Sequence, residues 1–409
     1  MCFKNLLVNL LHQKDKDGGG YTMKRKNVSM KIKISGAFIM TMAVVIVMIK
    51  ACGIVFAKGG KEASQTEEIK STFNKELCTI KDVYDYIDSL DSLNGEKLDI
   101  KRNLEGADIY CKTEDDVKIM QITDMHISGL EENYGKNILA MQTVYEMAER
   151  ERPDFIVATG DLVFGMAYTK SEDDRIALDM VLKFMDSMGI EWTWTFGNHD
   201  HDYFDRLETS ELTKILSETE LLYMPKNNPN LKGYSNGVFR IYRQNELASA
   251  LILLDSNGEI LDSNMELVTY DYIDESQILW YSDKIEELKK QAGKEIDTFV
   301  YMHIPLEEYA QITTEDYLSG EKRENVSCSR IYNNLAETMA GLGSTKALFC
   351  GHDHLNDFIS LYNGIYFVYG KSIDYTAYEG IENKTEQRGV CILNINNDNT
   401  FVIDNIRYC

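Results

Sequence analysis

Six of the seven histidines in this 409-residue chain follow short apolar segments, and five of these six lie within two residues of an aspartate or asparagine. The stretches that carry them, with one further aspartate, are QITDMHIS (121–128), ATGDLVFG (158–165), TFGNHDHD (195–202), VYMHIPLEEY (300–309) and FCGHDHLNDF (349–358). Imidazole, carboxylate and amide oxygen together suit divalent manganese, iron or zinc, and no set of thiolates accompanies them. The sequence therefore predicts a divalent metal site built from several separate segments.

The spacing within two of these stretches supports that prediction. Asp124 and His126 are two residues apart, as are His352 and His354. Side chains at this spacing point the same way in an extended segment, so each pair can face one metal centre. A single motif of this kind is typical of an ordinary capped turn. Five of them in order, each after a buried strand, are hard to explain as turns.

Strands and helices alternate along the chain and must position these residues. We expect strands over 117–123, 154–160, 191–197, 238–243, 248–256, 297–303, 345–351, 357–362, 365–369, 389–395 and 400–406. Helices are expected over 137–151, 174–189, 274–293 and 329–343. This alternation predicts an α/β fold with a largely parallel sheet and a second sheet packed on it. Sites in such folds lie outside the carboxyl ends of the strands, where the five stretches fall.

The N-terminal segment differs from the rest of the chain. Residues 23–33 are basic, and residues 34–49 contain no charge. A signal peptide or signal anchor is therefore expected over residues 1–57, with a membrane span at about 34–57 if it is not cleaved. A buried core helix is the alternative. The basic flank predicts an extracytoplasmic main body, either secreted or anchored to the membrane. We expect this main body to comprise a helical lead-in region (58–114) and a domain that contains all five histidine or aspartate stretches (115–409).

The main body is strongly acidic. Without residues 1–57 the chain has 34 Lys and Arg against 64 Asp and Glu, a formal net charge of −30. A surface of this charge repels polyanions, so a long nucleic acid is not expected as a partner. A small substrate is expected instead.

The motifs D-x-H, G-D, G-N-H-D, a single strand-end H and G-H-x-H, in this order over roughly residues 115–370, resemble the calcineurin-like metallophosphoesterase superfamily. HIPLEEY and CGHDHLNDF resemble its purple-acid-phosphatase-like branch. The resemblance implies a four-layer α/β/β/α sandwich of two packed mixed sheets with a dinuclear metal site. It also implies two ligand sets and two residues that act on substrate. In this resemblance the first metal takes Asp124, His126, Asp161 and His354. The second metal takes Asp161, Asn198, His303 and His352. His199 faces the substrate, and Asp200 orients His199.

Two positions depart from true purple acid phosphatases. Phe164 stands where those proteins carry a tyrosine ligand, and His126 is present where they lack a histidine. The resemblance therefore implies two divalent ions instead of a ferric–divalent pair coloured by tyrosinate.

The expected reaction is hydrolysis of phosphomonoesters or phosphodiesters by a metal-activated hydroxide at the dinuclear site. One alternative is a non-catalytic surface protein that binds metal. Another is a 5′-nucleotidase-like enzyme, although that family adds a large C-terminal substrate domain. Two polar segments, 255–276 and 306–328, are either a rim that selects the leaving group or ordinary surface loops.

Overall fold

The computed structural model describes residues 78–93, 98–112, 115–165, 170–204, 207, 209–216 and 218–408, all within one compact unit of residues 67–409. The predicted signal or anchor segment (1–57) lies outside these residues. Within the part of the chain that the structure describes, none of the helices has the length and hydrophobicity that crossing a membrane requires.

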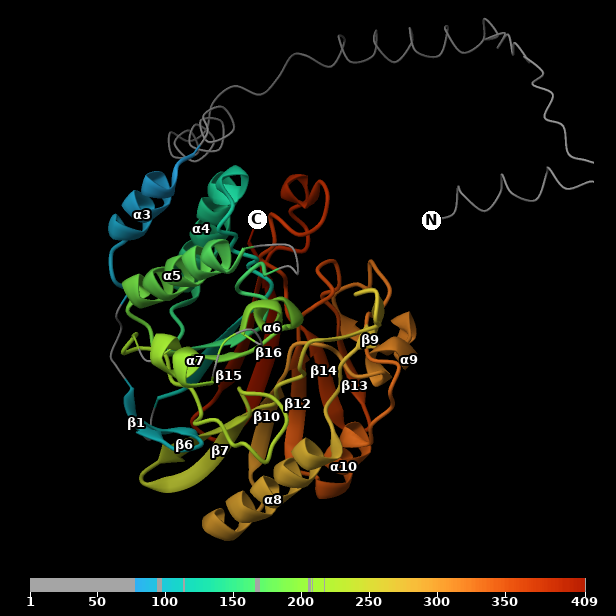
Figure 1. Cartoon of the computed structure of the whole chain (residues 1–409). Helices are drawn as coiled ribbons and strands as arrows, with labels where there is room; N and C mark the ends of the chain where they lie inside the picture. Colours follow the sequence, from blue (N-terminus) through green and yellow to red (C-terminus); the bar gives the residue numbers. More distant parts are fainter. Residues whose placement is uncertain are drawn as a thin grey trace, which may run out of the picture. The chain divides into compact units, whose positions relative to one another are not determined.

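Two large mixed sheets form the centre of the protein (Figure 1). The nine-stranded sheet has the order β1 (Asp99–Asn103), β2 (Gly106–Cys111), β6 (Gly237–Arg243), β7 (Glu246–Leu253), β10 (Asp297–Tyr301), β12 (Thr345–Cys350), β14 (Ile365–Tyr369), β13 (Ile359–Tyr362), β11 (Tyr317–Ser319). The five-stranded sheet has the order β16 (Phe401–Arg407), β15 (Gly389–Ile395), β3 (Val117–Ile122), β4 (Phe155–Thr159), β5 (Trp192–Thr195). A separate two-stranded sheet pairs β8 (Glu259–Leu261) with β9 (Leu267–Tyr270).

Helices cover the outer faces of both sheets (Figure 1). The α-helices are α3 (Ile80–Asp88), α4 (Tyr134–Glu151), α5 (Ser171–Met188), α6 (Asn198–Phe204), α7 (Thr209–Leu216), α8 (Glu275–Ala292), α9 (Glu308–Gln311) and α10 (Leu335–Leu342). Short 3-10 turns occur at Glu131–Asn133, Thr314–Asp316 and Ile381–Asn383.

Three apolar clusters follow from the alternation of side chains along the strands. Val117 and Val157 of the five-stranded sheet meet Phe239 and Phe299 of the nine-stranded sheet, so this cluster joins the two sheets. The opposite face of the five-stranded sheet packs against α4 and α5, and that of the nine-stranded sheet packs against α8 and α10. Burial of apolar area on all these faces stabilises the arrangement. The predicted four-layer α/β/β/α sandwich of mixed sheets is therefore confirmed.

The structure differs from the expected helical lead-in (58–114). In its described part, α3 is helical, but β1 and β2 form a hairpin, and β2 pairs in parallel with β6. The nine-stranded sheet thus extends on the N-terminal side of residue 115. The helix expected over 329–343 begins only at Leu335, after Asn334. Strands β8, β9 and β11 were not anticipated; each has only three or four residues, too few for a recognisable alternation.

Candidate metal centre

The backbone at the strand ends turns sharply and aims the candidate ligands at one region. Asp124, His126, Asp161 and His352 have φ angles of 56°, 49°, 51° and 78°, in the left-handed region that residues with a Cβ seldom adopt. Gly160 allows a close approach here, because a Cβ on it would lie 2.5 Å from the backbone nitrogen of the glycine that follows the neighbouring strand β5. Such strained positions cluster at functional sites, where the surrounding structure holds them in place.

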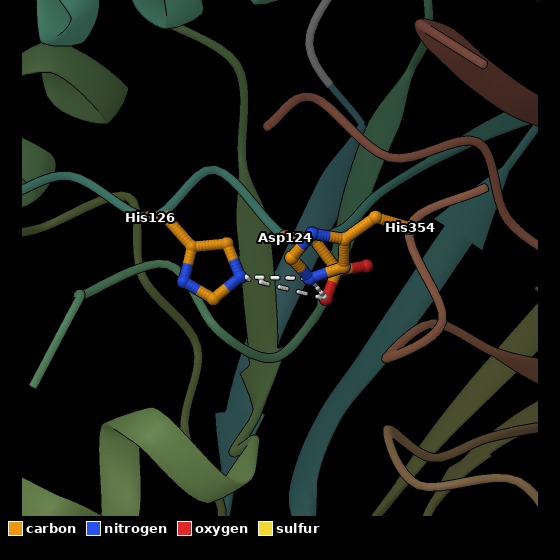
Figure 2. Close-up of side chains that lie close together, drawn as sticks. All are labelled: Asp124, His126 and His354. Atoms are coloured by element: carbon orange, nitrogen blue, oxygen red, sulfur yellow. Dashed lines mark hydrogen bonds and ion pairs between the residues drawn. The ribbon is translucent and has the colours of Figure 1, made fainter. Parts of the chain in front are cut away.

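The first group of ligands comprises Asp124, His126 and His354 (Figure 2). Nε2 of His126 lies 3.0 Å from Nε2 of His354, and these atoms are 3.9 and 3.5 Å from Oδ1 of Asp124. Nδ1 of His354 donates to Asp374, so Nε2 is the ring atom that faces the cation position and binds a metal once it is deprotonated. All three side chains are buried, and their ligand atoms converge on a space that suits a cation.

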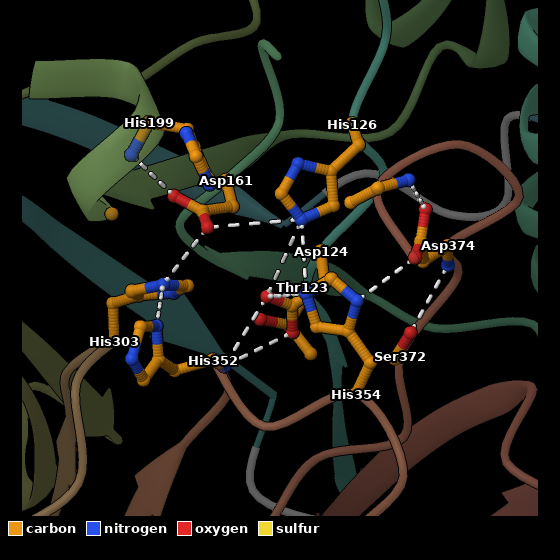
Figure 3. A network of polar contacts seen from close by, with 12 residues as sticks. Thr123, Asp124, His126, Asp161, His199, His303, His352, His354, Ser372 and Asp374 are labelled. Atoms are coloured by element: carbon orange, nitrogen blue, oxygen red, sulfur yellow. Dashed lines mark hydrogen bonds and ion pairs between the residues drawn. The ribbon is translucent and has the colours of Figure 1, made fainter. Parts of the chain in front are cut away.

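The second group comprises Asp161, His303 and His352 (Figure 3). Nε2 of His303 lies 3.2 Å from Oδ2 of Asp161 and 3.3 Å from Nδ1 of His352. Nδ1 of His303 donates to the carbonyl of Thr159 at 2.7 Å, so Nε2 is the ring atom that faces the centre. Asn198 follows the adjacent strand β5, and among the described residues its buried Oδ1 has no hydrogen-bond partner.

Asp161 connects the two groups. Its Oδ2 is 3.7 Å from Nε2 of His126 in addition to 3.2 Å from Nε2 of His303. A carboxylate in this position can bridge two metal ions. The donor set of imidazoles, carboxylates and one unpaired amide oxygen fits divalent cations, so these residues could bind a dinuclear centre.

The electrostatics of the histidines agree with this fit. Burial, and then the charge of a neighbouring imidazole, lowers the pKa of His126 to about 4 and that of His352 to about 3, so both are neutral at pH 7 and ready to bind metal. Burial alone would also lower the pKa of His303, but the Asp161 carboxylate raises it to about 9. Metal binding at His303 therefore releases a proton.

His199 lies at the edge of both groups. Its backbone N–H donates to Oδ1 of Asp161 at 2.9 Å, and its Nδ1 lies 2.8 Å from the carbonyl of Gly165 and 3.2 Å from Oδ2 of Asp202. The side chain lines a pocket together with ligands of both groups. Burial would lower the pKa of His199, but the carboxylates of Asp161 and Asp202 raise it to about 9. The imidazole is thus held as a cation.

The structure does not place Asp200 beside the His199 ring as expected. Oδ2 of Asp200 accepts from the backbone N–H groups of Asp161 and Gly197, both at 2.8 Å, and Oδ1 accepts from Val163 at 3.0 Å. Asp200 therefore connects the loop after β4 to the loop after β5 through these hydrogen bonds. Asp202 makes the contact predicted for Asp200, because residues three apart share one face of α6 whereas adjacent residues do not.

Asp374 was missed by the sequence analysis. Its buried carboxylate accepts from Nδ1 of His354 at 2.8 Å (Figure 3). A carboxylate behind a ligating histidine fixes the ring orientation and raises its basicity. Asp374 follows strand β14 by five residues, so the rule that found the other candidates, a polar residue after a strand, also applies to it.

Sequence comparison agrees with the fold and the ligand geometry. The profile of the calcineurin-like phosphoesterase family matches residues 117–356, and the chain belongs to this family. The chain is 28% identical over 326 residues to the probable inactive purple acid phosphatase 28 of Arabidopsis thaliana, covering 72% of this chain and 80% of the relative. It is 26% identical over 287 residues to the probable inactive purple acid phosphatase 29 of the same plant, covering 64% and 72%.

A solved structure is similar in fold. The dimetal phosphatase from Danio rerio aligns with a TM-score of 0.50 at 13% identity, covering 72% of this chain and 98% of the other. At this identity the similarity concerns the fold alone.

Proposed function

We propose that the protein hydrolyses small phosphomonoesters or phosphodiesters at a dinuclear metal centre. Asp124, His126, Asp161 and His354 would hold one metal; Asp161, Asn198, His303 and His352 would hold the other. The observation that carries the proposal is the position of the Asp161 carboxylate between the two groups. Its Oδ2 lies 3.7 Å from Nε2 of His126 in the first group and 3.2 Å from Nε2 of His303 in the second.

Two divalent cations, when bound, supply positive charge for the phosphate oxygens and lower the pKa of a water molecule. Manganese, iron and zinc all suit the donors. The tyrosine ligand of true purple acid phosphatases is replaced by Phe164, whose ring meets that of His126 edge-on at 5.1 Å. This supports a pair of divalent ions.

His199 is the proposed acid. Its Nδ1 is held by the Gly165 carbonyl and the Asp202 carboxylate, which leaves Nε2 for an oxygen of the substrate. A protonated imidazole here stabilises charge on a phosphate oxygen or protonates the leaving oxygen. Asp202 positions the ring, and Asp200 positions the loops that carry Asp161 and Asn198.

The test is turnover by stripped protein after addition of manganese, zinc or ferrous iron. We expect hydrolysis of 4-nitrophenyl phosphate or bis(4-nitrophenyl) phosphate with at least one metal, at a stoichiometry of two metals per chain by elemental analysis. Binding of two metals without turnover of any ester would establish the alternative, a non-catalytic metal-binding protein. The names of the Arabidopsis relatives favour that alternative, whereas the complete set of seven candidate ligands favours the enzyme. A stoichiometry that stays at one after metal loading would contradict the dinuclear centre.

We further propose that the catalytic unit lies outside the cytoplasm. The support is the basic segment 23–33 followed by the uncharged segment 34–49. Fractionation of cells that express the full chain tests this. Recovery of the protein in the cytosol with residues 1–57 still attached would refute it.

A further inference from the structure

The hairpin of β8 and β9 places an acid and an aromatic ring beside the metal ligands. Glu259 and Tyr270 are directly paired across this two-stranded sheet. Paired residues on neighbouring strands carry their side chains on the same face, about 5 Å apart at Cβ. The ring of Tyr270 meets the imidazole of His352 edge-on, with centroids 4.4 Å apart. The hairpin thus forms one wall of the pocket over the ligands.

Two further aromatic rings complete the walls. Tyr378 stacks on His354 with centroids 4.2 Å apart at 17°, and Phe164 lies 5.3 Å from the ring of His199. With Glu259 and Tyr270, both rings line a pocket of about 180 Å³ that also contains ligands of both metal groups. Pockets for drug-sized ligands start at about 300 Å³. The space beside the phosphate position therefore suits a small leaving group.

The lining of the pocket is rich in carboxylates. Among the described residues that line it, none is lysine or arginine, whereas Glu259 and Asp353 contribute carboxylates. The described ion pairs give Asp353 and Glu259 no lysine or arginine partner, although Asp353 accepts hydrogen bonds from Tyr369 and Ser327. The cationic imidazole of His199 also lines the pocket but is already assigned to the phosphate at the metal centre, so a second phosphate on the substrate would find no lysine or arginine here.

A neighbouring cavity is also lined by Glu259 and, among its described lining residues, offers no free lysine or arginine. It measures about 370 Å³, and Lys232 is the only lysine or arginine among its described lining residues. The ammonium of Lys232 is 2.5 Å from Oδ1 of Asp271, so its charge is already neutralised. Among their described lining residues, neither space therefore offers a free lysine or arginine to a polyanionic leaving group.

From these observations we infer that the pocket binds the ammonium group of a cationic leaving group, so that the substrate is the phosphate ester of an amino alcohol. This inference rests on the proposed phosphoesterase function and names its substrate class. Aromatic rings attract organic cations, most strongly where water is excluded, and the half-buried Glu259 carboxylate adds a charge interaction. The phosphate would lie at the metal centre and the ammonium between Glu259, Tyr270 and Tyr378.

The experiment compares two substrates of nearly equal shape. Phosphocholine carries a quaternary ammonium, and 3,3-dimethylbutyl phosphate replaces that nitrogen by carbon. We expect kcat/KM of the metal-loaded protein to be at least about tenfold higher for phosphocholine, the size of one desolvated cation contact. Glu259→Gln should reduce this ratio by about tenfold, and Tyr270→Leu should also reduce it. Glu266→Gln, an exposed change on the same hairpin, is the matched control and should leave the ratio unchanged.

Equilibrium binding gives a readout that does not depend on turnover. By calorimetry, choline should bind the metal-loaded wild-type protein more tightly than 3,3-dimethylbutanol, and Glu259→Gln should abolish the difference. Equal kcat/KM for the two esters, or a ratio that Glu259→Gln leaves unchanged, would overturn the inference while the proposed function stands. Absence of turnover for every ester, 4-nitrophenyl phosphate included, would overturn the proposed function; in that case equal binding of the two alcohols would overturn the inference as well.

Discussion

Oδ2 of Asp374 accepts a hydrogen bond from Nδ1 of His354 at 2.8 Å, while Oδ1 accepts the backbone N–H groups of Thr376 and Ala377 at 2.6 and 2.8 Å. The backbone of its own loop therefore holds the Asp374 carboxylate in the position from which it orients the His354 imidazole. Burial alone would raise the pKa of Asp374, but the charge of His354 holds it well below its usual range. Asp374 stays ionised and keeps Nε2 of His354 directed at the first metal position.

Replacement of this carboxylate should weaken metal binding without removing a ligand. We expect Asp374→Asn to lower metal affinity by roughly 10- to 100-fold, the loss typical of a partner behind a ligating histidine. Metal titration of stripped protein measures this. Asp283→Asn, an exposed change on α8, is the matched control. An affinity equal to that of wild type would show that Asp374 does not position His354.

The bridging position of Asp161 predicts a coupled loss. Asp161→Asn removes a charge that both cations would use, so we expect both metals to be lost along with activity. Elemental analysis after gel filtration measures the metal content, and circular dichroism controls for folding. Retention of two tightly bound metals in this variant would contradict the bridging assignment.

His199 should behave differently, because it is assigned to the substrate. His199→Ala should retain both metals but lose activity by roughly 10²- to 10⁴-fold, the range of a positioned acid. The loss should be smaller for 4-nitrophenyl phosphate than for an alkyl phosphate, since nitrophenolate leaves without a proton. Equal losses on both esters would make His199 an electrostatic stabiliser. His199 also lies near His126 and Asp161 in a possible ligand group, and loss of metal from the variant would assign it there.

The buried pair of Asp255 and His201 predicts a pH-dependent stability. Oδ1 of Asp255 lies 2.8 Å from Nε2 of His201, and Oδ2 accepts the backbone N–H of Tyr234 at 2.7 Å. Asp255→Asn should lower the free energy of unfolding by about 3 kcal/mol at pH 7, as expected when one partner of a buried pair is removed. Urea unfolding measures the difference.

The sign of the pH effect follows from the carboxyl group. Burial would raise the pKa of Asp255, but His201 and backbone N–H groups lower it to about 2. The unfolded chain has a pKa of about 3.9, so this stabilisation is complete above pH 4 and is lost as the pH falls from about 4 to about 2. The difference between wild type and Asp255→Asn should shrink over that window. A constant difference would show that the ionised carboxylate is not its source.

The spectrum should identify the metal pair as divalent. Phe164 has no phenolic oxygen to bind ferric iron, so we expect no intense visible charge-transfer band in the metal-loaded protein. Absorption spectroscopy before and after reduction checks this. An intense band that survives reduction and disappears on chelation would show a ligand beyond those assigned.

The candidate ligands could be predicted from the sequence because the signal is local. Each lies at the end of a buried strand, so an apolar segment followed by a polar residue marks it, and parallel strands bring such ends to one edge. Six of these residues lie around one centre in the structure: Asp124, His126, Asp161, His303, His352 and His354 (Figure 3). The seventh, Asn198, lines the same pocket as Asp161, His352 and His354. The alternation of strands and helices likewise indicated the layered fold.

The residues that contact His199 and that line the pocket could not be predicted from the sequence, because they depend on where a helix begins and on how two strands pair. The choice of Asp202 over Asp200 requires that α6 begins at Asn198, since a helix brings the third residue, not the next, onto the face of His199. The pairing of Glu259 with Tyr270 depends on the register of two short strands, which shifts between Ile260 and Leu261. A one-residue slip in a strand moves its side chains to the other face, so only the tertiary structure decides whether this pair faces the pocket.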